Sequence, residues 1–297
     1  MKIIFSKKGF DTQNGKWPSP ILPDGSMYSI PIPASEGNFR YGQLEYKLNG
    51  LTRIMNDVTG NSIKSGKKVY IDFDYAHTHF TAHNDPFWIE EQYLKGYVLG
   101  PLWSAQGHLR NYKVGRGDLF LFYGIFQEVE EVDGKWRYQP ESRMRYVFFG
   151  WLQIGEIVDL HDRQRRSDLL QQVPGIKSHP HVYKDYKINN MLYIPMQGDL
   201  MIGGKSTGKD CSGRFSYHNK RCLSSPFNNN TLNPWLLPRC FSSKEAFSKK
   251  TVIQQVNDQS IEITFLAKFN QEVVFDIDKL NDMGKAQTYE FLYNLMD

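Results

Sequence analysis

The fold of this chain is decided by Gly117-Asp118-Leu119-Phe120-Leu121-Phe122-Tyr123-Gly124-Ile125-Phe126, a nearly continuous apolar run that follows a turn. Its length and its aromatic residues predict a buried strand. A hairpin turn is expected at Gly134, and a second long strand-forming run occupies residues 145–158. Gly150 and Gly155 within that run suit bulges or bends. Strands joined by short hairpins favour an antiparallel sheet or a partly closed barrel.

The segments outside this core predict peripheral helices and long polar loops. Helices are expected at residues 43–58 and 159–173, and a closing helix at residues 284–296. We find no internal repeat and no clear interdomain linker. The sequence therefore predicts one α+β domain over residues 1–297, with a central β-rich core at about residues 115–160.

The composition is that of a globular protein with an aromatic core. Hydrophobic residues make up 40% of the 297 residues, and the chain contains 19 Phe, 17 Tyr and 6 Trp. Disordered chains are poor in aromatic residues, so disorder of the whole chain is excluded. No apolar run approaches the ~18–20 residues needed to cross a bilayer, and the first residues lack the apolar stretch of a signal peptide. We therefore expect no membrane partner.

Cysteine usage and net charge indicate the cellular compartment and the kind of partner. Three widely spaced cysteines without a Cys-x-x-Cys pair argue against a disulfide framework or a zinc finger, and favour a cytoplasmic protein. Lys and Arg number 36 against 32 Asp and Glu, which gives a net charge of +4. A protein that coats nucleic acid is usually more basic. A nucleotide or nucleic acid partner would thus be contacted locally, and the sequence leaves the oligomeric state open.

The densest polar cluster lies at residues 72–85. It contains three of the eight histidines within seven residues, and four further polar residues: Asp72, Asp74, His77, His79, His83, Asn84 and Asp85. In an extended segment, side chains two residues apart point the same way. Carboxylates and imidazoles together suit zinc, iron or manganese. A divalent metal cofactor is one interpretation, with His77 and His79 as candidate ligands; a polar loop with local hydrogen bonds is the other.

Two further motifs carry histidine. In His179-Pro180-His181 the proline holds the two imidazoles in a fixed relation, which suits acid–base groups or phosphate contacts, or else a rigid surface turn. In the segment 103–109, Gln106 and His108 are also two residues apart. Gln106 has the donor and acceptor needed to read a base edge. The alternative is a capped helix that buries its apolar residues.

Two common catalytic motifs are absent from the sequence. The glycine-rich segment 115–118 lacks the spacing of a phosphate-binding loop and its trailing Lys-Ser/Thr. In segment 203–208, Asp199 stands where the first glycine of such a loop would be required. No Gly-x-Ser-x-Gly nucleophile elbow is present. A P-loop nucleotidase and a serine hydrolase of that type are therefore not supported.

Blocks along nearly the whole chain resemble the nucleotide modification associated domain 3 family. They keep the family's order and are Ser6-Lys7-Lys8-Gly9-Phe10-Asp11, Pro18-Ser19-Pro20-Ile21, Pro23-Asp24-Gly25, Pro31-Ile32-Pro33, Arg40-Tyr41-Gly42, Ala105-Gln106-Gly107-His108-Leu109, Gly117 to Gly124, Gly150 to Glu156, His179-Pro180-His181, Trp235-Leu236-Leu237-Pro238 and Gln287-Thr288-Tyr289-Glu290-Phe291. One departure is Asp72-Phe73-Asp74, where the family tends to carry an Asp-Pro-Asp-like segment. The resemblance implies a bacterial or phage setting linked to DNA base modification or phage defence. The central strands are also similar to PUA-like barrels, which include readers of modified bases.

The first functional hypothesis is an enzyme that makes, removes or processes a modified nucleobase or nucleotide. Asp72 or Asp74 would be the general base or a metal ligand, and His108, His179 or His181 the acid–base partner. Lys8 and Arg40 would hold phosphate. The expected nucleotide-binding residues are Lys8, Asp11, Arg40, Tyr41, Trp103 and Gln106.

The alternative hypothesis is a reader that binds a modified base without chemistry. It would place a flipped base in an aromatic pocket near Trp103, Phe122, Tyr123 and Trp151, read by Gln106. A scaffold role within a larger modification complex is the third hypothesis.

Overall fold

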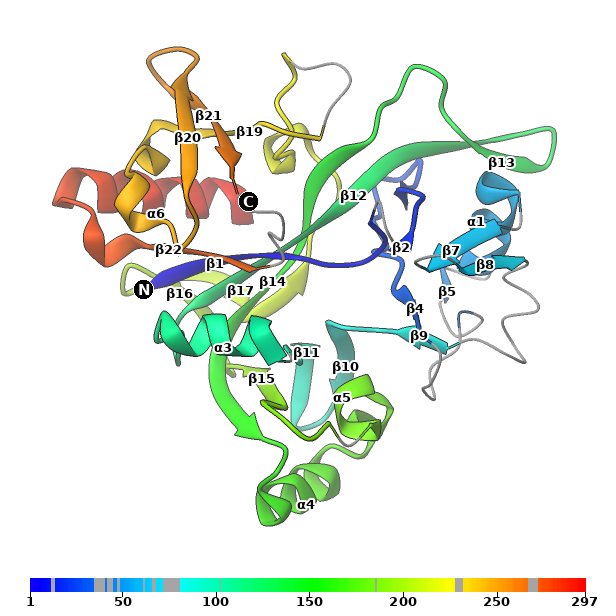
Figure 1. Cartoon of the computed structure of the whole chain (residues 1–297), viewed down its shortest axis with the longest axis horizontal. Coiled ribbons are helices and arrows are strands. Elements are labelled where there is room, and N and C mark those ends of the chain that lie inside the picture. The colour runs from blue at the N-terminus through cyan, green and yellow to red at the C-terminus, as the bar shows by residue number, and fades with distance from the viewer. Residues whose placement is uncertain are drawn as a thin grey trace.

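A long two-stranded antiparallel pair organises the molecule. The computed structural model describes residues 1–11, 14–34, 41, 45–46, 49–60, 62–65, 68–71, 81–101, 103–184, 186–227, 232–266 and 272–297. Strands β12 (Leu119–Val132) and β14 (Arg145–Asp159) correspond to the two apolar runs of the sequence. They pair from Leu119 opposite Gln153 to Phe126 opposite Arg145, and they cross the centre of Figure 1.

The main sheet is built outward from this pair. On one side β1 (Lys2–Lys7) runs parallel to β12, and β22 (Glu272–Asp276) runs antiparallel to β1. On the other side β15 (Met191–Pro195) pairs with β14. Three shorter strands add to β12 or β14: β3 (Ser19–Ile21), β13 (Lys135–Tyr138) and β18 (Ser212–Arg214).

The predicted α+β architecture with a β-rich core is confirmed, with a sheet that is mixed and open. The order β15-β14-β12-β1-β22 does not return on itself, so the described strands do not close into a barrel. Register shifts occur opposite Gly150 and at Gly155, as predicted for these glycines. A side chain at Gly155 would lie 2.6 Å from the Met196 backbone, so the close approach of β15 requires glycine there.

Aromatic side chains fill the main core, as the composition predicts. Phe5 of β1 is fully buried and contacts Phe148, Trp235 and Phe241, with ring centroids 5.5–5.9 Å apart. Two smaller cores flank it. One lies under α1 (Leu51–Thr59), and the other packs beneath α4 (Arg163–Gln172).

The remaining elements surround the main sheet. The expected helix at 43–58 begins only at Leu51, and the closing helix α6 (Asp282–Met296) begins after Asn281, whose Oδ1 accepts the Gly284 N–H at 2.8 Å.

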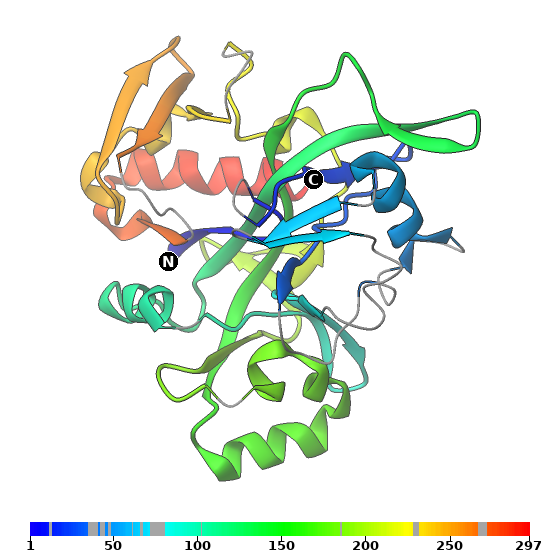
Figure 2. The same ribbon diagram turned by 45° about the vertical axis from the view of Figure 1, so that its right-hand side comes forward.

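The other helices are α3 (Trp103–Asn111), α5 (Pro180–Tyr183) and the 3-10 turns η2 (Pro174–Ser178), η3 (Asn219–Arg221), η4 (Arg239–Phe241), η5 (Lys244–Ala246) and η6 (Ile277–Lys279). The other strands are β2 (Asn14–Gly15), β4 (Ile32–Ala34), β5 (Glu45–Tyr46), β6 (Asn49–Gly50), β7 (Ser62–Ser65), β8 (Lys68–Ile71), β9 (Thr81–His83), β10 (Phe87–Glu91), β11 (Leu94–Val98), β16 (Asp199–Ile202), β17 (Lys205–Asp210), β19 (Trp235–Pro238), β20 (Thr251–Gln255) and β21 (Ser260–Phe265). In Figures 1 and 2, α6 lies beside the β19–β21 sheet at one end, and α4 lies at the bottom.

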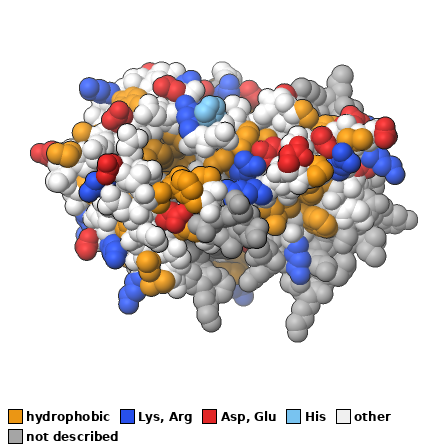
Figure 3. Space-filling model, turned by 90° about the horizontal axis from the view of Figure 1, so that it is seen from above, with side chains coloured by type: hydrophobic (Ala, Val, Ile, Leu, Met, Phe, Trp, Pro, Cys, Tyr) orange, Lys and Arg blue, Asp and Glu red, His pale blue; other side chains and the backbone are white. Residues whose placement is uncertain are grey.

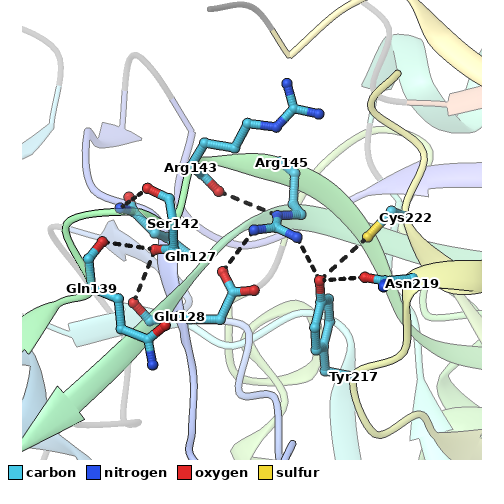
Figure 4. A network of polar contacts seen from close by, with 9 residues as sticks. All are labelled: Gln127, Glu128, Gln139, Ser142, Arg143, Arg145, Tyr217, Asn219 and Cys222. Carbon is cyan, nitrogen blue, oxygen red and sulfur yellow. Dashed lines mark hydrogen bonds and ion pairs between the residues drawn. The ribbon is translucent and has the colours of Figure 1, made fainter. Parts of the chain in front are cut away.

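A polar network ties the β12–β14 hairpin to the segment that follows β18 (Figure 4). Arg145 donates to Glu128 Oε2 at 2.9 Å and also to the Tyr217 hydroxyl. The Tyr217 hydroxyl in turn donates to Asn219 Oδ1 at 3.0 Å. Burial raises the pKa of Tyr217, so its hydroxyl keeps the proton that it donates. The network thus fixes the hairpin where the two strands leave the main core.

None of the described helices is both long enough and apolar enough to cross a membrane.

The central position of Phe5 gives a test of this core. Phe5→Ala should lower the free energy of unfolding by about 3–5 kcal/mol, because it leaves a cavity among three aromatic rings. Urea unfolding followed by tryptophan fluorescence measures the change. Phe227, which is 65% exposed, provides the matched control, and Phe227→Ala should change stability by less than about 0.5 kcal/mol. Equal losses in the two variants would contradict the assignment of Phe5 to the core.

Candidate functional site

Six ionisable side chains from four distant segments converge beside the main sheet. They are Lys8 after β1, His83 and Asp85 at the end of β9, His179 and His181 around the start of α5, and Glu272 at the start of β22. We call this group the Asp85 cluster. Ionisable groups are rarely gathered in a protein interior without a functional or structural reason, because removing their charges from water is costly.

Asp85 lies at the centre of the cluster. Its Oδ1 accepts the backbone N–H of Gly100 at 2.8 Å and lies 3.4 Å from His179 Nε2. Its Oδ2 lies 3.8 Å from Lys8 Nζ. Lys8 and His179 hold the pKa of Asp85 far below its usual range, against the opposing effect of burial. The carboxylate is therefore charged at neutral pH.

Gly100 allows the two loops to meet. A Cβ atom at this position would lie 2.5 Å from His181 Cγ and 2.8 Å from His179 Cε1. Any other residue would displace both imidazoles or move the N–H that holds Asp85. The close approach of the backbone to the histidines therefore requires glycine.

The His179-Pro180-His181 motif forms the start of α5 and orients one imidazole. His179 caps this short helix, and its Nδ1 accepts the N–H of His181 at 3.1 Å. With Nδ1 as an acceptor, the proton lies on Nε2, which faces Asp85 Oδ1 and Val98 O at 3.4 and 3.3 Å. His179 is thus a fixed donor that orients the Asp85 carboxylate.

His83 and His181 face one another across the cluster. Their Nε2 atoms are 3.3 Å apart. Burial lowers the pKa of His181 to about 2 and that of His83 to about 4, although Asp85 offsets part of the effect. Both imidazoles are therefore neutral at pH 7, and each retains a nitrogen lone pair that can accept a proton or bind a metal ion.

Lys8 joins the cluster to β22. Its Nζ lies 3.1 Å from Glu272 Oε1, which is closer than its 3.8 Å approach to Asp85. Burial opposes the charge on Lys8, but Glu272 and Asp85 outweigh it and raise the pKa of Lys8. Burial raises the pKa of Glu272, and Lys8 offsets part of this shift. The ammonium group of Lys8 thus holds two buried carboxyl groups in place.

An aromatic pair, the exposed Trp103 and the half-buried Tyr186, lies between the surface and the cluster. Trp103 is 61% exposed, and its ring centroid lies 6.2 Å from that of Tyr186. The Tyr186 ring lies 5.4 Å from the His181 ring, and Lys184 Nζ lies 5.5 Å from the Tyr186 centroid. Trp103 has a φ of 47°, a backbone conformation that is strained for a bulky residue.

Of the residues predicted from sequence, the structure brings Lys8, His179 and His181 together. His108 instead lies beside Ser248, with Nε2 3.0 Å from its Oγ. Gln106 is buried and accepts the Tyr193 hydroxyl at 3.0 Å. The predicted residues Asp72, Asp74, His77, His79 and Arg40 lie outside the described residues.

The other predicted binding residues have structural contacts. The Asp11 carboxylate accepts the Asn14 N–H at 2.6 Å in a turn. Tyr41 is fully buried in the smaller core under α1, and its hydroxyl donates to Pro31 O at 2.8 Å. Three aromatic residues expected around a flipped base belong to the main core: Phe122, Tyr123 and Trp151. Trp103 is the member of that predicted pocket that is exposed.

The site residues predicted from the sequence do not include three members of the cluster. His83 and Asp85 belong to the polar segment 72–85, but nothing local separates them from its other histidines and aspartates. Their signal is the pair spacing His83-x-Asp85, which places a carboxylate and an imidazole at one strand end. Glu272 has a weaker signal, an acidic residue that opens an apolar strand.

The Asp85 cluster contains a set of potential metal ligands. One ligand atom from each of His83, Asp85 and His181 can be chosen so that all three lie within 4.8 Å of one another. Neutral imidazole and ionised carboxylate are the protonation states that metal binding requires. The same groups can also position and deprotonate a substrate without a metal.

A groove of about 1310 Å³ lies elsewhere, between β19, η4 and α6. Its lining includes Leu236, Pro238, Arg239, Gln259, Lys279 and Glu290. No residue that lines it belongs to the Asp85 cluster. Figure 3 shows hydrophobic side chains around a hollow at this end of the molecule, with basic and acidic side chains interleaved across the face. The described residues of this face therefore form no continuous basic surface for nucleic acid.

Comparison with known proteins gives one match. The family model described as nucleotide modification associated domain 3 matches residues 2–276, a span that contains the whole Asp85 cluster. Neither a curated protein nor a solved structure matches the chain significantly.

The close approach at Gly100 can be tested with a matched pair of glycines. Gly100→Ala should lower the free energy of unfolding by about 1–3 kcal/mol, because the new methyl group overlaps both imidazoles. Gly107 in α3 has no neighbouring atom within 4 Å of an added Cβ, so Gly107→Ala should raise stability by about 0.5–1 kcal/mol. Urea unfolding measures both, and a Gly100→Ala variant as stable as the wild type would disprove the close approach.

Proposed function

Since the chain belongs to the nucleotide modification associated domain 3 family, we propose that it is an enzyme that processes a nucleobase or nucleotide at the Asp85 cluster. The observation that carries this proposal is the convergence of Lys8, Asp85 and three histidines from segments far apart in the sequence. Such a set of oriented, perturbed ionisable groups is characteristic of reaction centres.

The geometry assigns separate tasks within the centre. Asp85 is charged and is oriented by Gly100 and His179, so it offers a fixed negative charge. His83 is only partly buried, so a substrate could reach its neutral imidazole, which can accept a proton. Lys8 acts through Asp85 and Glu272 and is a positioning residue.

The aromatic pair of Trp103 and Tyr186 supplies a way to bind the substrate. A nucleobase can stack on Trp103 or Tyr186, because every base presents a π face to an aromatic ring. Lys184 provides a cation beside the same ring for a phosphate group. The contact between Tyr186 and His181 would bring a stacked base next to the centre. This local arrangement agrees with the small net charge of +4.

A non-catalytic reader of modified bases is the second candidate function. The 61% exposure of Trp103 favours it, since an aromatic platform can bind a base without any reaction. A reader would leave the nucleotide unchanged, so product formation separates the two functions.

Nucleoside mass spectrometry on expressing cells tests the enzyme. Cells supply the co-substrates, and both the nucleotide pool and the digested DNA should contain a nucleoside of altered mass. Asp85→Asn keeps the size of the side chain but removes its charge, so product should fall at least about 100-fold. Thermal unfolding checks that the variant is folded. Full product formation by Asp85→Asn, or none by the wild type, would contradict the proposal.

Binding of the purified protein tests the aromatic platform. Trp103→Ala should weaken binding of a fluorescent single-stranded oligonucleotide or nucleotide by about 5–100-fold, the cost of one stacked base. Tyr93, which is 66% exposed in the β10–β11 turn, is the matched control, and Tyr93→Ala should bind as the wild type does. Equal binding by the Trp103→Ala variant would show that the platform is not used. Tight binding without product would identify a reader.

A further inference from the structure

We propose that His83, Asp85 and His181 bind one divalent transition-metal ion. The binding of the ion is inferred from these three residues alone, and only a role of the ion in the reaction rests on the proposed function. The three residues supply two imidazoles and one carboxylate. Two histidines and a carboxylate form a common protein site for zinc, iron and related ions, with coordination positions left for water or substrate.

The distance between the two imidazoles fits a shared ion. His83 Nε2 and His181 Nε2 are 3.3 Å apart. Two nitrogens bound to one tetrahedral zinc ion at about 2.0–2.1 Å lie about 3.3 Å from each other. The ring centroids are 5.2 Å apart and tilted by 55°, so the rings do not stack. The rings therefore meet through their Nε2 atoms and not through their faces.

The charge of the cluster also suits a cation. Lys8 is nearer to Glu272 than to Asp85, by 3.1 Å against 3.8 Å, so Glu272 is its main partner. An ion would share the charged Asp85 carboxylate with Lys8. The Asp85 carboxylate is held by the Gly100 N–H and His179. Residues that bind metal ions in proteins are usually oriented by hydrogen bonds of this kind from neighbouring groups.

One proposed ligand is buried and another is partly exposed, which would leave one side of the ion open to a substrate. His181 is only 1% exposed, and its Nδ1 has no hydrogen-bond partner among the described residues. His83 is partly exposed, so one side of the proposed ion faces the substrate approach. Nitrogen ligands select against Mg²⁺ and Ca²⁺, which prefer oxygen. Zn²⁺, Fe²⁺, Mn²⁺ and Co²⁺ are the expected occupants, and each can polarise a phosphate or carbonyl oxygen.

Cobalt and zinc titration of the full chain tests the site. The protein is first dialysed against EDTA, then titrated with Co²⁺ while the visible absorption of bound cobalt is recorded, and with Zn²⁺ by calorimetry. We expect one ion per chain. His83→Gln should weaken binding at least 10-fold, and because His83 is partly exposed this variant should fold. Asp85→Asn provides a second variant at another ligand.

A matched control is His161→Gln. His161 also lies beside a carboxylate, with Nδ1 3.0 Å from Asp159 Oδ1, but it lacks the second imidazole. This variant should bind one ion with unchanged affinity. No bound ion, or equal affinity in the His83→Gln and wild-type proteins, would overturn the proposal. Metal binding without nucleotide turnover would support the metal site and contradict the enzyme, whereas turnover in EDTA with no bound ion would support the enzyme and overturn the metal site.

Discussion

The parallel pairing of β1 with β12 is the constraint on which the rest of the structure depends. It places β1 between β12 and β22 in the main sheet, where Phe5 packs in the aromatic core. The same pairing continues past the strand end, because the Lys8 N–H donates to Tyr123 O at 2.9 Å. This fixes the backbone from which the Lys8 side chain reaches Glu272 and Asp85. The sheet therefore determines where the candidate site is assembled.

The Asp85 cluster contains buried charged groups, and their cost in folding free energy must be offset by other contacts. Removing one partner from a buried ion pair costs more than the pair itself contributes, since an unpaired charge remains. Lys8 shared between Glu272 and Asp85, together with the Gly100 N–H, reduces that cost. Proteins accept such locally unfavourable groups at functional sites and recover stability elsewhere. Here the aromatic packing around Phe5 and Trp235 is the principal source of that stability.

Local sequence patterns predicted the parts of the fold that depend on neighbouring residues. The apolar runs that became β12 and β14, and the bulges at Gly150 and Gly155, follow from periodicity and glycine geometry. Periodicity does not reveal the parallel partner of β1, since no hairpin joins the two strands. The site shows the same limit: His179-Pro180-His181 is visible as a motif, but its partner His83 is 98 positions away. Gln106 was predicted to bind a base, whereas tertiary packing places it against Tyr193.

The distance along the chain between β1 and its neighbours has a consequence for how the protein is made. Lys8 and Glu272, which meet at one end of the β1–β22 pair, are separated by 264 positions. During synthesis β1 leaves the ribosome long before β12, and much longer before β22, so its hydrogen-bonding edges and Phe5 stay unpartnered meanwhile. Contacts of such long sequence separation slow folding and prolong the exposure of apolar strands. The Asp85 cluster can therefore be completed only after β22 has been synthesised.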